Sequence, residues 1–395
     1  MIRSSIPVIL LALTLGLISI GITMVYSSSA NKAAVDRRTS LRRVDPEAYV
    51  NDFDFHDPRY LWRQASYAGM GLALLLVMSI VDHQRLKTLA PAILAVTIVL
   101  LCLVFLPSPI GVASHGSRRW VNLGVFTLQP SEVAKLAIII FGSSLLVKRD
   151  RYLDSFWKGV VPPLAFAGVC AGLIYKEKDL GAAAVLGMVT LLLMFVAGVR
   201  LRHLAPLVLG AVALGVASIC RNPYQWERIV KWVNFIIYGP RPGDQVSQSV
   251  IAAGVGGLWG SGIATSSQGS PLPEAHTDFI FAIVAEELGF VRCLIIICAF
   301  AALIGLGAYV AHHAADAFGG YLAAGITSLL ALSVCLNLLV VLGWFPPKGL
   351  ALPFISYGGT SLLVNCAAVG ILINVAKYAA PEHPVPARAV RRIPR

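Results

Sequence analysis

Charged residues are scarce in this chain of 395 residues, because Asp, Glu, Lys and Arg together make up only 13% of it. A soluble globular domain carries about 25% charged residues, so the composition argues against a soluble enzyme. The seven cysteines include no CxxC pair, and most lie in apolar runs, so they indicate neither a disulfide framework nor a metal site. No strand precedes the glycine run at 254–262, which therefore does not form a nucleotide-binding fingerprint.

Long apolar segments are what the chain has in abundance. Hydrophobic residues make up 57% of it, and the mean hydropathy is +0.75. A helix of about 20 apolar residues crosses the ~30 Å hydrocarbon core of a bilayer. We therefore predict an all-α polytopic membrane protein with ten transmembrane helices, at residues 6–27, 64–81, 90–107, 131–147, 160–175, 181–199, 204–220, 279–311, 321–343 and 360–378.

Two of these spans need comment. The first resembles a secretory signal sequence, since Arg3 precedes it and small residues follow it at 27–30. Its apolar run of about 20 residues is longer than the 7–15 of a signal sequence, so we predict a retained helix. The eighth span, 279–311, is too long for one straight crossing, which predicts that it tilts or extends beyond the bilayer.

The loops predict the topology. An even number of spans places both termini on one side, and the short loops on that side are rich in Lys and Arg, which predicts that the termini are cytoplasmic. The long loops 28–63, 108–130 and 221–278 then face outward, the last between helices seven and eight. Residues 1–380 form one transmembrane domain, and 381–395 form a basic, disordered tail that contacts anionic lipid. The net charge of +12 is thus explained by the membrane, and we expect no nucleic-acid partner.

The loop 221–278 contains Trp226, Trp232 and Trp259, an apolar stretch and five glycines, so we expect it to fold on the membrane surface. An interfacial re-entrant hairpin without chemistry is an equal alternative. The loop ends at Thr277 and Asp278. Either residue is a candidate N-cap of the next helix. Asp278 is alternatively a general base at the outer edge of the membrane.

Three further ionisable side chains lie inside predicted spans. Glu286 and Glu287 follow Asp278 by eight and nine residues, about 12 Å deeper along a helix. Lys135, close to Glu132, enters the fourth span from the same face. Because charges at this depth are costly, they are usually paired or functional. We favour a structural pair between Lys135 and a glutamate inside the bundle, and the alternative is a proton path or substrate contact.

Basic residues gather in the outward loops. Arginine suits phosphate oxygens through its planar set of donors, so an outer basic vestibule would suit an anionic lipid headgroup such as a pyrophosphate. Taken singly, each of these residues is better explained as a solvated loop charge or a headgroup anchor, and the neighbouring Trp120 as part of the interfacial aromatic belt. The residues are Arg118, Arg119, Lys176, Lys178, Arg221, Arg228, Lys231 and Lys348.

Seven short motifs, in this order, resemble the SEDS family, the RodA/FtsW type of peptidoglycan glycosyltransferase. The resemblance spans nearly the whole chain, and the last two motifs, which contain Pro-Glu-x-x-Thr-Asp-Phe and Ser-Tyr-Gly-Gly, are highly specific together. The chain departs from the pattern at Lys178, where the family usually has Pro, and at Thr360, where Ser is common. The motifs start at His115, Gln129, Asp179, Glu227, Gln248, Pro273 and Leu352.

The resemblance implies ten helices with cytoplasmic termini in the bacterial inner membrane, and polymerisation of lipid II into β-1,4 glycan strands outside. Asp278 would be the catalytic base, and a divalent cation such as Mg or Mn could assist. It also implies a class B penicillin-binding protein as partner, with other division or elongation proteins, and the FtsW branch is weakly favoured. The implied substrate-binding residues are Arg118, Arg119, Trp120, Lys135, Arg228, Gln248, His276, Lys348 and Ser356.

Two other functions compete with this one. A lipid II flippase would also need buried charges and a lipid-facing cavity, but along a path through the bilayer rather than at its outer edge. A scaffold that only recruits other proteins would leave Asp278 with no role except as a helix cap.

Overall fold

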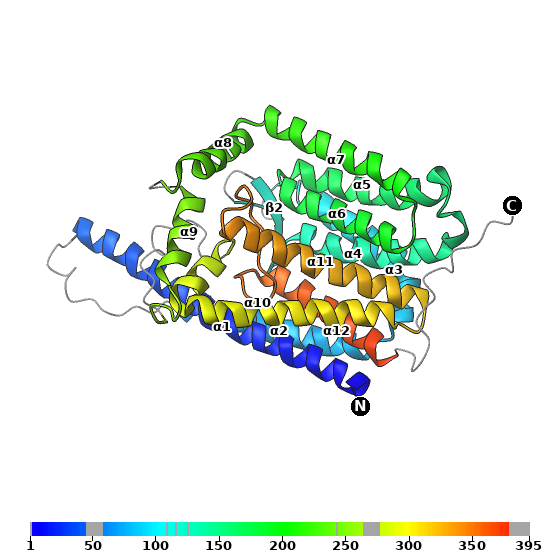
Figure 1. The fold of residues 1–395 in the computed structure, drawn as a ribbon, viewed down its shortest axis with the longest axis horizontal. Coiled ribbons are helices and arrows are strands. Elements are labelled where there is room, and N and C mark those ends of the chain that lie inside the picture. The colour runs from blue at the N-terminus through cyan, green and yellow to red at the C-terminus, as the bar shows by residue number, and fades with distance from the viewer. Residues whose placement is uncertain are drawn as a thin grey trace.

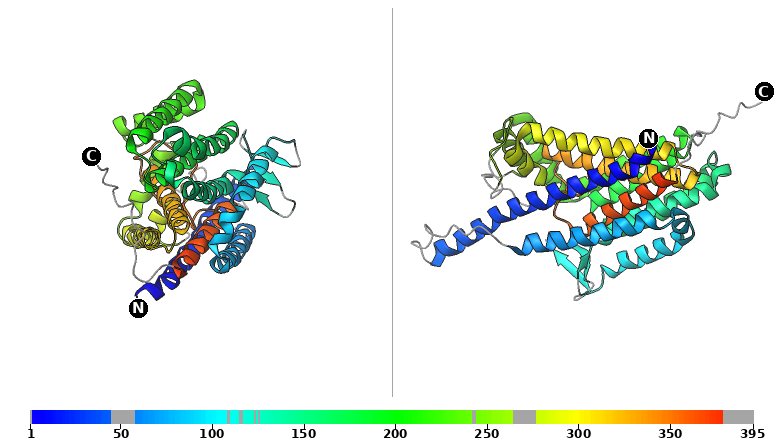
Figure 2. Two further views of the ribbon diagram at one scale, coloured as in Figure 1. Left: turned by 90° about the vertical axis from the view of Figure 1, so that its right-hand side faces the viewer. Right: turned by 90° about the horizontal axis from the view of Figure 1, so that it is seen from below.

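The structure, a computed structural model, describes residues 2–44, 58–107, 110–114, 117–122, 124, 126–241, 244–263 and 277–378. Long helices run side by side in one bundle (Figures 1 and 2). A 3-10 turn at Asp150–Tyr152 and a π turn at Phe156–Val160 join α4 to α5. The helices are α1 (Ile2–Val44), α2 (Pro58–Ile80), α3 (His83–Leu103), α4 (Pro130–Lys148), α5 (Val161–Lys176), α6 (Leu180–Val196), α7 (Leu201–Arg221), α8 (Pro223–Tyr238), α9 (Gln245–Val255), α10 (Ile280–His312), α11 (Ala317–Val341) and α12 (Gly359–Lys377).

Within the described residues, eight helices are long and apolar enough to cross a membrane. They are the Ser5–Ser28 part of α1, α3, α4, α5 with its preceding turn, α7, α10, α11 and α12. The apolar helix α6 is shorter, with 17 residues, and α2 packs along α12. Each predicted span therefore overlaps a helix, and the helical membrane fold is confirmed, while the number of ten crossings stays a prediction.

Two helices extend into the predicted loop 28–63, because α1 continues to Val44 and α2 already begins at Pro58. No glycine or proline lies between Ser27 and Val44, so nothing in the local sequence ends the helix where the apolar run ends. Figure 2 shows this part of α1 projecting beyond the bundle. The predicted tail 381–395 lies outside the described residues.

The predicted loop 108–130 contains a small antiparallel sheet, an addition to the expected all-helical fold. Its strands are β1 (Gly111–Ser114), β2 (Ser117–Asn122) and β3 (Thr127–Leu128), in the order β1-β2-β3. Val112 pairs with Trp120 across β1 and β2, and Val121 pairs with Leu128 across β2 and β3. The sheet therefore fixes the side chains of β2 on a rigid element.

The two ends of the bundle differ. The start of α1 and the end of α12 lie at one end (Figure 1). There His83 Nε2 contacts Asp316 Oδ2 at 2.8 Å and links the α2–α3 and α10–α11 turns. Burial favours the neutral form of Asp316, but hydrogen bonds with His83 and the Gly319 N–H outweigh it and lower the pKa of Asp316 to about 2. The opposite end, called the loop end below, carries the sheet, α8, α9 and the α11–α12 loop (residues 342–358).

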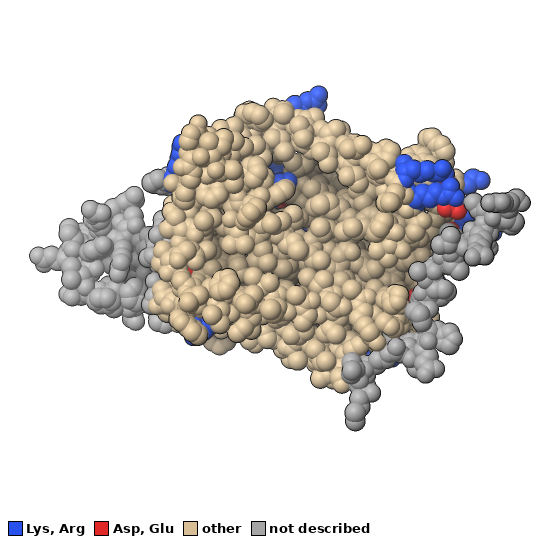
Figure 3. All heavy atoms as spheres, in the orientation of Figure 1, with Lys and Arg blue, Asp and Glu red and all other residues tan. Residues whose placement is uncertain are grey.

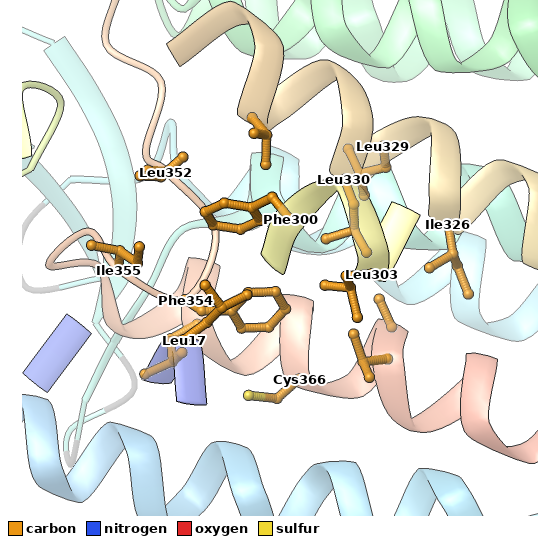
Figure 4. Packing of buried hydrophobic residues seen from close by; sticks show 14 of the residues in the cluster. Leu17, Phe300, Leu303, Ile326, Leu329, Leu330, Leu352, Phe354, Ile355 and Cys366 are labelled. Carbon is orange, nitrogen blue, oxygen red and sulfur yellow. The ribbon is translucent and has the colours of Figure 1, made fainter. Parts of the chain in front are cut away.

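The α11–α12 loop is anchored in the hydrophobic core. Leu352, Phe354 and Ile355 are each at most 2% exposed. Figure 4 shows them in one cluster with Leu17 of α1 and side chains of α10, α11 and α12. Phe354 has a φ of 65°, a conformation that costs a non-glycine residue free energy and persists only when packing enforces it. Packing in the hydrophobic core therefore fixes the backbone conformation of this loop at the end of the bundle.

Helix α10 is broken at Gly289, where φ is 77° and ψ is 175°. The long eighth span is thus a short half-helix, Ile280–Leu288, followed by a long one, which is the physical reason for its length. The segment 257–262, after α9, lies against the break. Its Ser261 and Gly262 N–H groups donate to the carbonyls of Glu286 and Glu287, and its Gly257 carbonyl accepts from the Phe290 N–H. Main-chain groups freed by the break are therefore satisfied inside the protein, as a membrane interior demands.

Candidate active site

Asp278 lies at the loop end, in a turn directly before α10. The N-cap of α10 is Phe279, which makes no side-chain capping bond. Neither Thr277 nor Asp278 therefore occupies the N-cap position, and the capping interpretation of the sequence is wrong. The carboxylate of Asp278 remains partly exposed, which suits a group that must meet a substrate.

Two buried polar side chains hold the main chain around Asp278. The amide Nδ2 of Asn337 in α11 donates to Asp278 O at 2.9 Å and to Leu350 O at 2.6 Å. The hydroxyl of Ser356 donates to Thr277 O at 2.6 Å and accepts from the Leu352 N–H at 2.8 Å. The predicted substrate residue Ser356 is thus 4% exposed and bonded to the main chain, which favours a positioning role.

The α11–α12 loop also meets the Asp278 side chain. A Cβ atom added to Gly349 would lie 2.8 Å from Asp278 Oδ2, so the carboxylate rests directly over this glycine. Lys348 is therefore the sequence neighbour of the residue that touches Asp278. A Cβ atom on Gly181 would lie 3.9 Å from Lys348 Cδ and 3.5 Å from Asp179 Oδ1, which places the lysine stem beside Asp179 at the start of α6. Burial lowers the pKa of the Lys348 ammonium, and the Asp179 carboxylate opposes this.

The turn between α5 and α6 binds Arg119 of β2. The guanidinium donates from Nη2 to Lys178 O at 2.7 Å and from Nε to Glu177 O at 3.5 Å. Its Nη1 lies 3.9 Å from Asp179 Oδ2. Asp179 also caps α6 by accepting from the Ala182 N–H at 3.0 Å. The turn therefore brings Arg119 and Lys348 to the two sides of Asp179.

Glu177 in this turn was not among the residues predicted for the site. Its side chain is 2% exposed, and neither carboxylate oxygen has a hydrogen-bond partner. Burial and the neighbouring Asp179 raise its pKa to about 8, although Arg119 opposes the shift. Its place two residues before the Asp-Leu-Gly motif was the only signal in the sequence, and nothing there indicates burial. Asn337, also missed, had no signal at all inside its apolar span.

Arg118 and Trp120 flank Arg119 on β2. Arg118 is exposed and its Nη1 donates to Leu106 O at 3.4 Å, at the limit of a hydrogen bond. Trp120 is partly buried. Arg119 is the extra residue of an irregularity in the strand pairing, because Trp120 pairs with Val112 and Arg118 pairs with Ala113. Of these three predicted substrate residues, the structure thus places Arg119 beside Asp179 and Lys348.

The predicted pair between Lys135 and a glutamate forms with Glu132. Lys135 Nζ binds Glu132 Oε1 at 2.7 Å, one turn away on α4, because this local partner is always within reach. Glu287 instead accepts hydrogen bonds from Ser27 Oγ of α1 at 2.6 and 2.7 Å. Glu286 and Glu287 are each 1% exposed in the half-helix that follows Asp278.

The predicted loop 221–278 contains the helices α8 and α9, and α8 is an amphipathic helix at the loop end. Arg228 Nη1 donates to Pro347 O at 3.3 Å, and Trp232 Nε1 donates to Gly343 O at 2.9 Å. Both bonds tie α8 to the α11–α12 loop. Gln248 lies in α9, where its Oε1 is buried without a partner. His276 lies outside the described residues.

The loop end therefore combines a carboxylate with two cations. Asp278, Lys348 and Arg119 come from α10, the α11–α12 loop and β2, segments far apart in the sequence. Figure 3 shows the surface hollowed beside the end of α11, with basic and acidic atoms inside the hollow. The carboxylate can accept a proton, and the cations can bind an anionic group. In the part of the chain that the structure describes, no group of three or more His, Cys, Asp or Glu residues could hold a metal ion.

These features define a polytopic helical membrane protein with a charged site at one end of its bundle. Residues 8–380 match the cell cycle protein family of FtsW, RodA and SpoVE, and the chain belongs to this family. It is 36% identical to stage V sporulation protein E of Bacillus subtilis, over 95% of this chain and 98% of that protein. It is 37% identical to the probable peptidoglycan glycosyltransferase FtsW of Geobacter metallireducens, over 93% of each chain.

Two solved structures share the fold. A chain from a peptidoglycan synthase complex, described as coordinating polymerization and crosslinking, has a TM-score of 0.71 and 26% identity, covering 93% of this chain and 96% of its own. A mutant of the rod shape determining protein RodA of Thermus thermophilus has a TM-score of 0.66 and 25% identity, covering 94% and 98%. The resemblance drawn from the motifs is therefore confirmed at the level of family and fold.

Proposed function

We propose that this protein is a peptidoglycan glycosyltransferase that polymerises lipid II into β-1,4 glycan strands at the outer face of the bacterial cytoplasmic membrane. The observation that carries the proposal is the contact of the Asp278 carboxylate with Gly349, the residue that follows Lys348 in the chain. Relatives named as probable peptidoglycan glycosyltransferases, and the likeness to a chain of a peptidoglycan synthase complex, support it.

Asp278 acts as the general base. Its carboxylate takes the proton of the GlcNAc 4-hydroxyl of one lipid II as that oxygen attacks the MurNAc anomeric carbon of the other. The bond between this carbon and the diphosphate breaks, and undecaprenyl diphosphate leaves with the electron pair. Attack from the opposite face inverts the anomeric carbon and gives a β-1,4 bond. Asp278 then releases its proton to water at the outer face.

Arg119 and Lys348 stabilise the charge that develops on the departing diphosphate. Cations fixed before the reaction are effective here, because they need not reorganise as the charge grows. Only two of the five N–H donors of Arg119 are used by the α5–α6 turn, so the others can bind phosphate oxygens. We assign no step of the reaction to a metal ion.

The other predicted substrate residues have separate roles in this proposal. Arg118, Trp120, Gln248 and His276 contact the substrate. Arg228 acts through its bond to Pro347, which holds the α11–α12 loop in place. The Glu132–Lys135 pair and the buried Glu286 and Glu287 serve structure or proton transfer.

The partner in this proposal is a class B penicillin-binding protein, which crosslinks the strands within a division or elongation assembly. The likeness to a chain of a peptidoglycan synthase complex supports this pairing. Both termini face the cytoplasm, because the start of α1 and the end of α12 lie at the end of the bundle opposite the site.

The test is glycan-strand formation from purified lipid II, with and without the partner, by wild type and Asp278→Asn. The amide keeps the size of the side chain but cannot take the proton, so polymer formation should fall at least a thousandfold while lipid II binding remains. Asp154→Asn, which removes an exposed carboxylate bonded to Arg200 outside the site, is the matched control and should keep full activity. If Asp278→Asn polymerises normally, the assignment is wrong. If no variant polymerises and lipid II crosses vesicle membranes, the protein is a flippase.

A further inference from the structure

Glu177 is an acid that the proposed reaction does not use. The residue is only 2% exposed, and both of its carboxyl oxygens lack a hydrogen-bond partner among the described residues. An unpaired carboxylate is costly in such a place, so a structural role alone would favour an apolar residue. The group nonetheless lies in the turn that binds Arg119 and ends at Asp179.

The surroundings of Glu177 link it to the diphosphate-binding cations. Arg119 bonds the main-chain carbonyls of Glu177 and Lys178, and its guanidinium approaches Asp179. Asp179 in turn lies beside the stem of Lys348. Any change of charge at Glu177 is therefore felt by the Arg119 guanidinium, in surroundings that screen charge less than water does.

We infer that Glu177 is a positioning residue of this site: as a neutral carboxyl it leaves the Arg119 guanidinium free for diphosphate oxygens, and as a carboxylate it holds the guanidinium and repels the substrate. The inference rests on the proposed function and deepens it. It makes substrate binding, rather than the chemical step, sensitive to the protonation of one buried group.

The direction of the pH dependence follows from the burial. Burial and Asp179 raise the pKa of Glu177 to about 8, so the group is neutral at pH 7 and becomes a carboxylate as the pH rises through 8. The KM for lipid II should therefore rise on the alkaline side. One added negative charge near the diphosphate weakens its binding about tenfold at an effective dielectric constant of about 20.

Other charged groups surround the turn and must be separated from Glu177. Burial lowers the pKa of Lys348, so this lysine can lose its charge at alkaline pH in any variant that retains it. The difference between wild type and a Glu177 variant cancels such contributions. The groups on this turn and on the elements packed around it are Arg119 of β2, Asp179 of α6, Lys348 of the α11–α12 loop, Glu132 and Lys135 of α4, Arg221 of α7, and the exposed Lys176 and Lys178.

The experiment measures kcat and KM for lipid II polymerisation between pH 6.5 and 9.5, in Glu177→Gln, wild type and a control. Glutamine copies the neutral carboxyl in size and hydrogen-bonding capacity, so the variant should fold and match wild type at pH 7. Its KM should stay about tenfold below that of wild type at pH 9, with equal kcat. Asp154→Asn, which removes an exposed carboxylate bonded to Arg200 outside the site, should keep the wild-type profile.

The same alkaline rise of KM in wild type and Glu177→Gln would overturn the inference, as would a flat wild-type profile. Inhibition by inorganic pyrophosphate at pH 7 and pH 9 gives a second measurement, which should weaken more in wild type than in Glu177→Gln. Failure of the proposed function looks different: wild type would make no polymer at pH 7, or Asp278→Asn would retain full activity.

Discussion

The break in α10 leads to a sharp prediction for Gly289→Ala. The backbone of Gly289, with φ of 77° and ψ of 175°, occupies a region that essentially only glycine adopts, and forcing another residue into it costs about 1–3 kcal/mol. A Cβ atom would also lie 2.5 Å from the Trp259 carbonyl carbon and 2.8 Å from Leu258 O. The segment 257–262 must then move away.

This movement would break the hydrogen bonds from the Phe290 and Val291 N–H groups to the carbonyls of Gly257 and Leu258. At about 1 kcal/mol for each bond, the total destabilisation is about 3–5 kcal/mol. Because the half-helix 280–288 begins two residues after Asp278, polymerisation should fall along with stability.

The assay compares thermal unfolding and glycan-strand formation of Gly289→Ala and Gly305→Ala in detergent. Gly305 lies in the same helix with nothing within 4 Å of an added Cβ atom, so alanine there should stabilise by about 0.5–1 kcal/mol. Equal melting temperatures and equal activities of the two variants would refute the structural reasoning about the break.

Three further predictions concern single polar contacts. Asn337→Leu keeps the volume but removes two main-chain hydrogen bonds at the site, so kcat should fall at least about tenfold while KM stays constant; a change in KM alone would contradict this. Ser27→Ala removes the hydroxyl that binds the buried Glu287, and calorimetry should show a loss of about 1–3 kcal/mol. Asp316, with its pKa lowered from 3.8 to about 2, stabilises the fold above pH 3.8, so Asp316→Asn should lower the melting temperature at pH 7. That difference should shrink as the pH falls from 3.8 toward 2, and a constant difference would refute it.

The sequence by itself determined the helices. A run of apolar residues must form a helix in a membrane, because the backbone groups have no other partners there. The predicted spans therefore overlap the observed helices, and specific motifs led to the family and to Asp278. The end of α1 was missed because hydropathy marks where a helix leaves the membrane, whereas the helix itself ends only where its backbone hydrogen bonds end.

Only the tertiary structure decided which groups meet. Lys135 pairs with Glu132, one turn away on the same helix. Asn337 donates a hydrogen bond to the main chain of Asp278, although 59 positions separate the two residues. Glu177 reads as a solvent-exposed loop acid in the sequence, yet the folded chain buries it beside Arg119. Hydrophobicity is a property of each segment, so it can be read locally. Burial of a charge and the distance between two side chains depend on how whole segments pack, which no local pattern contains.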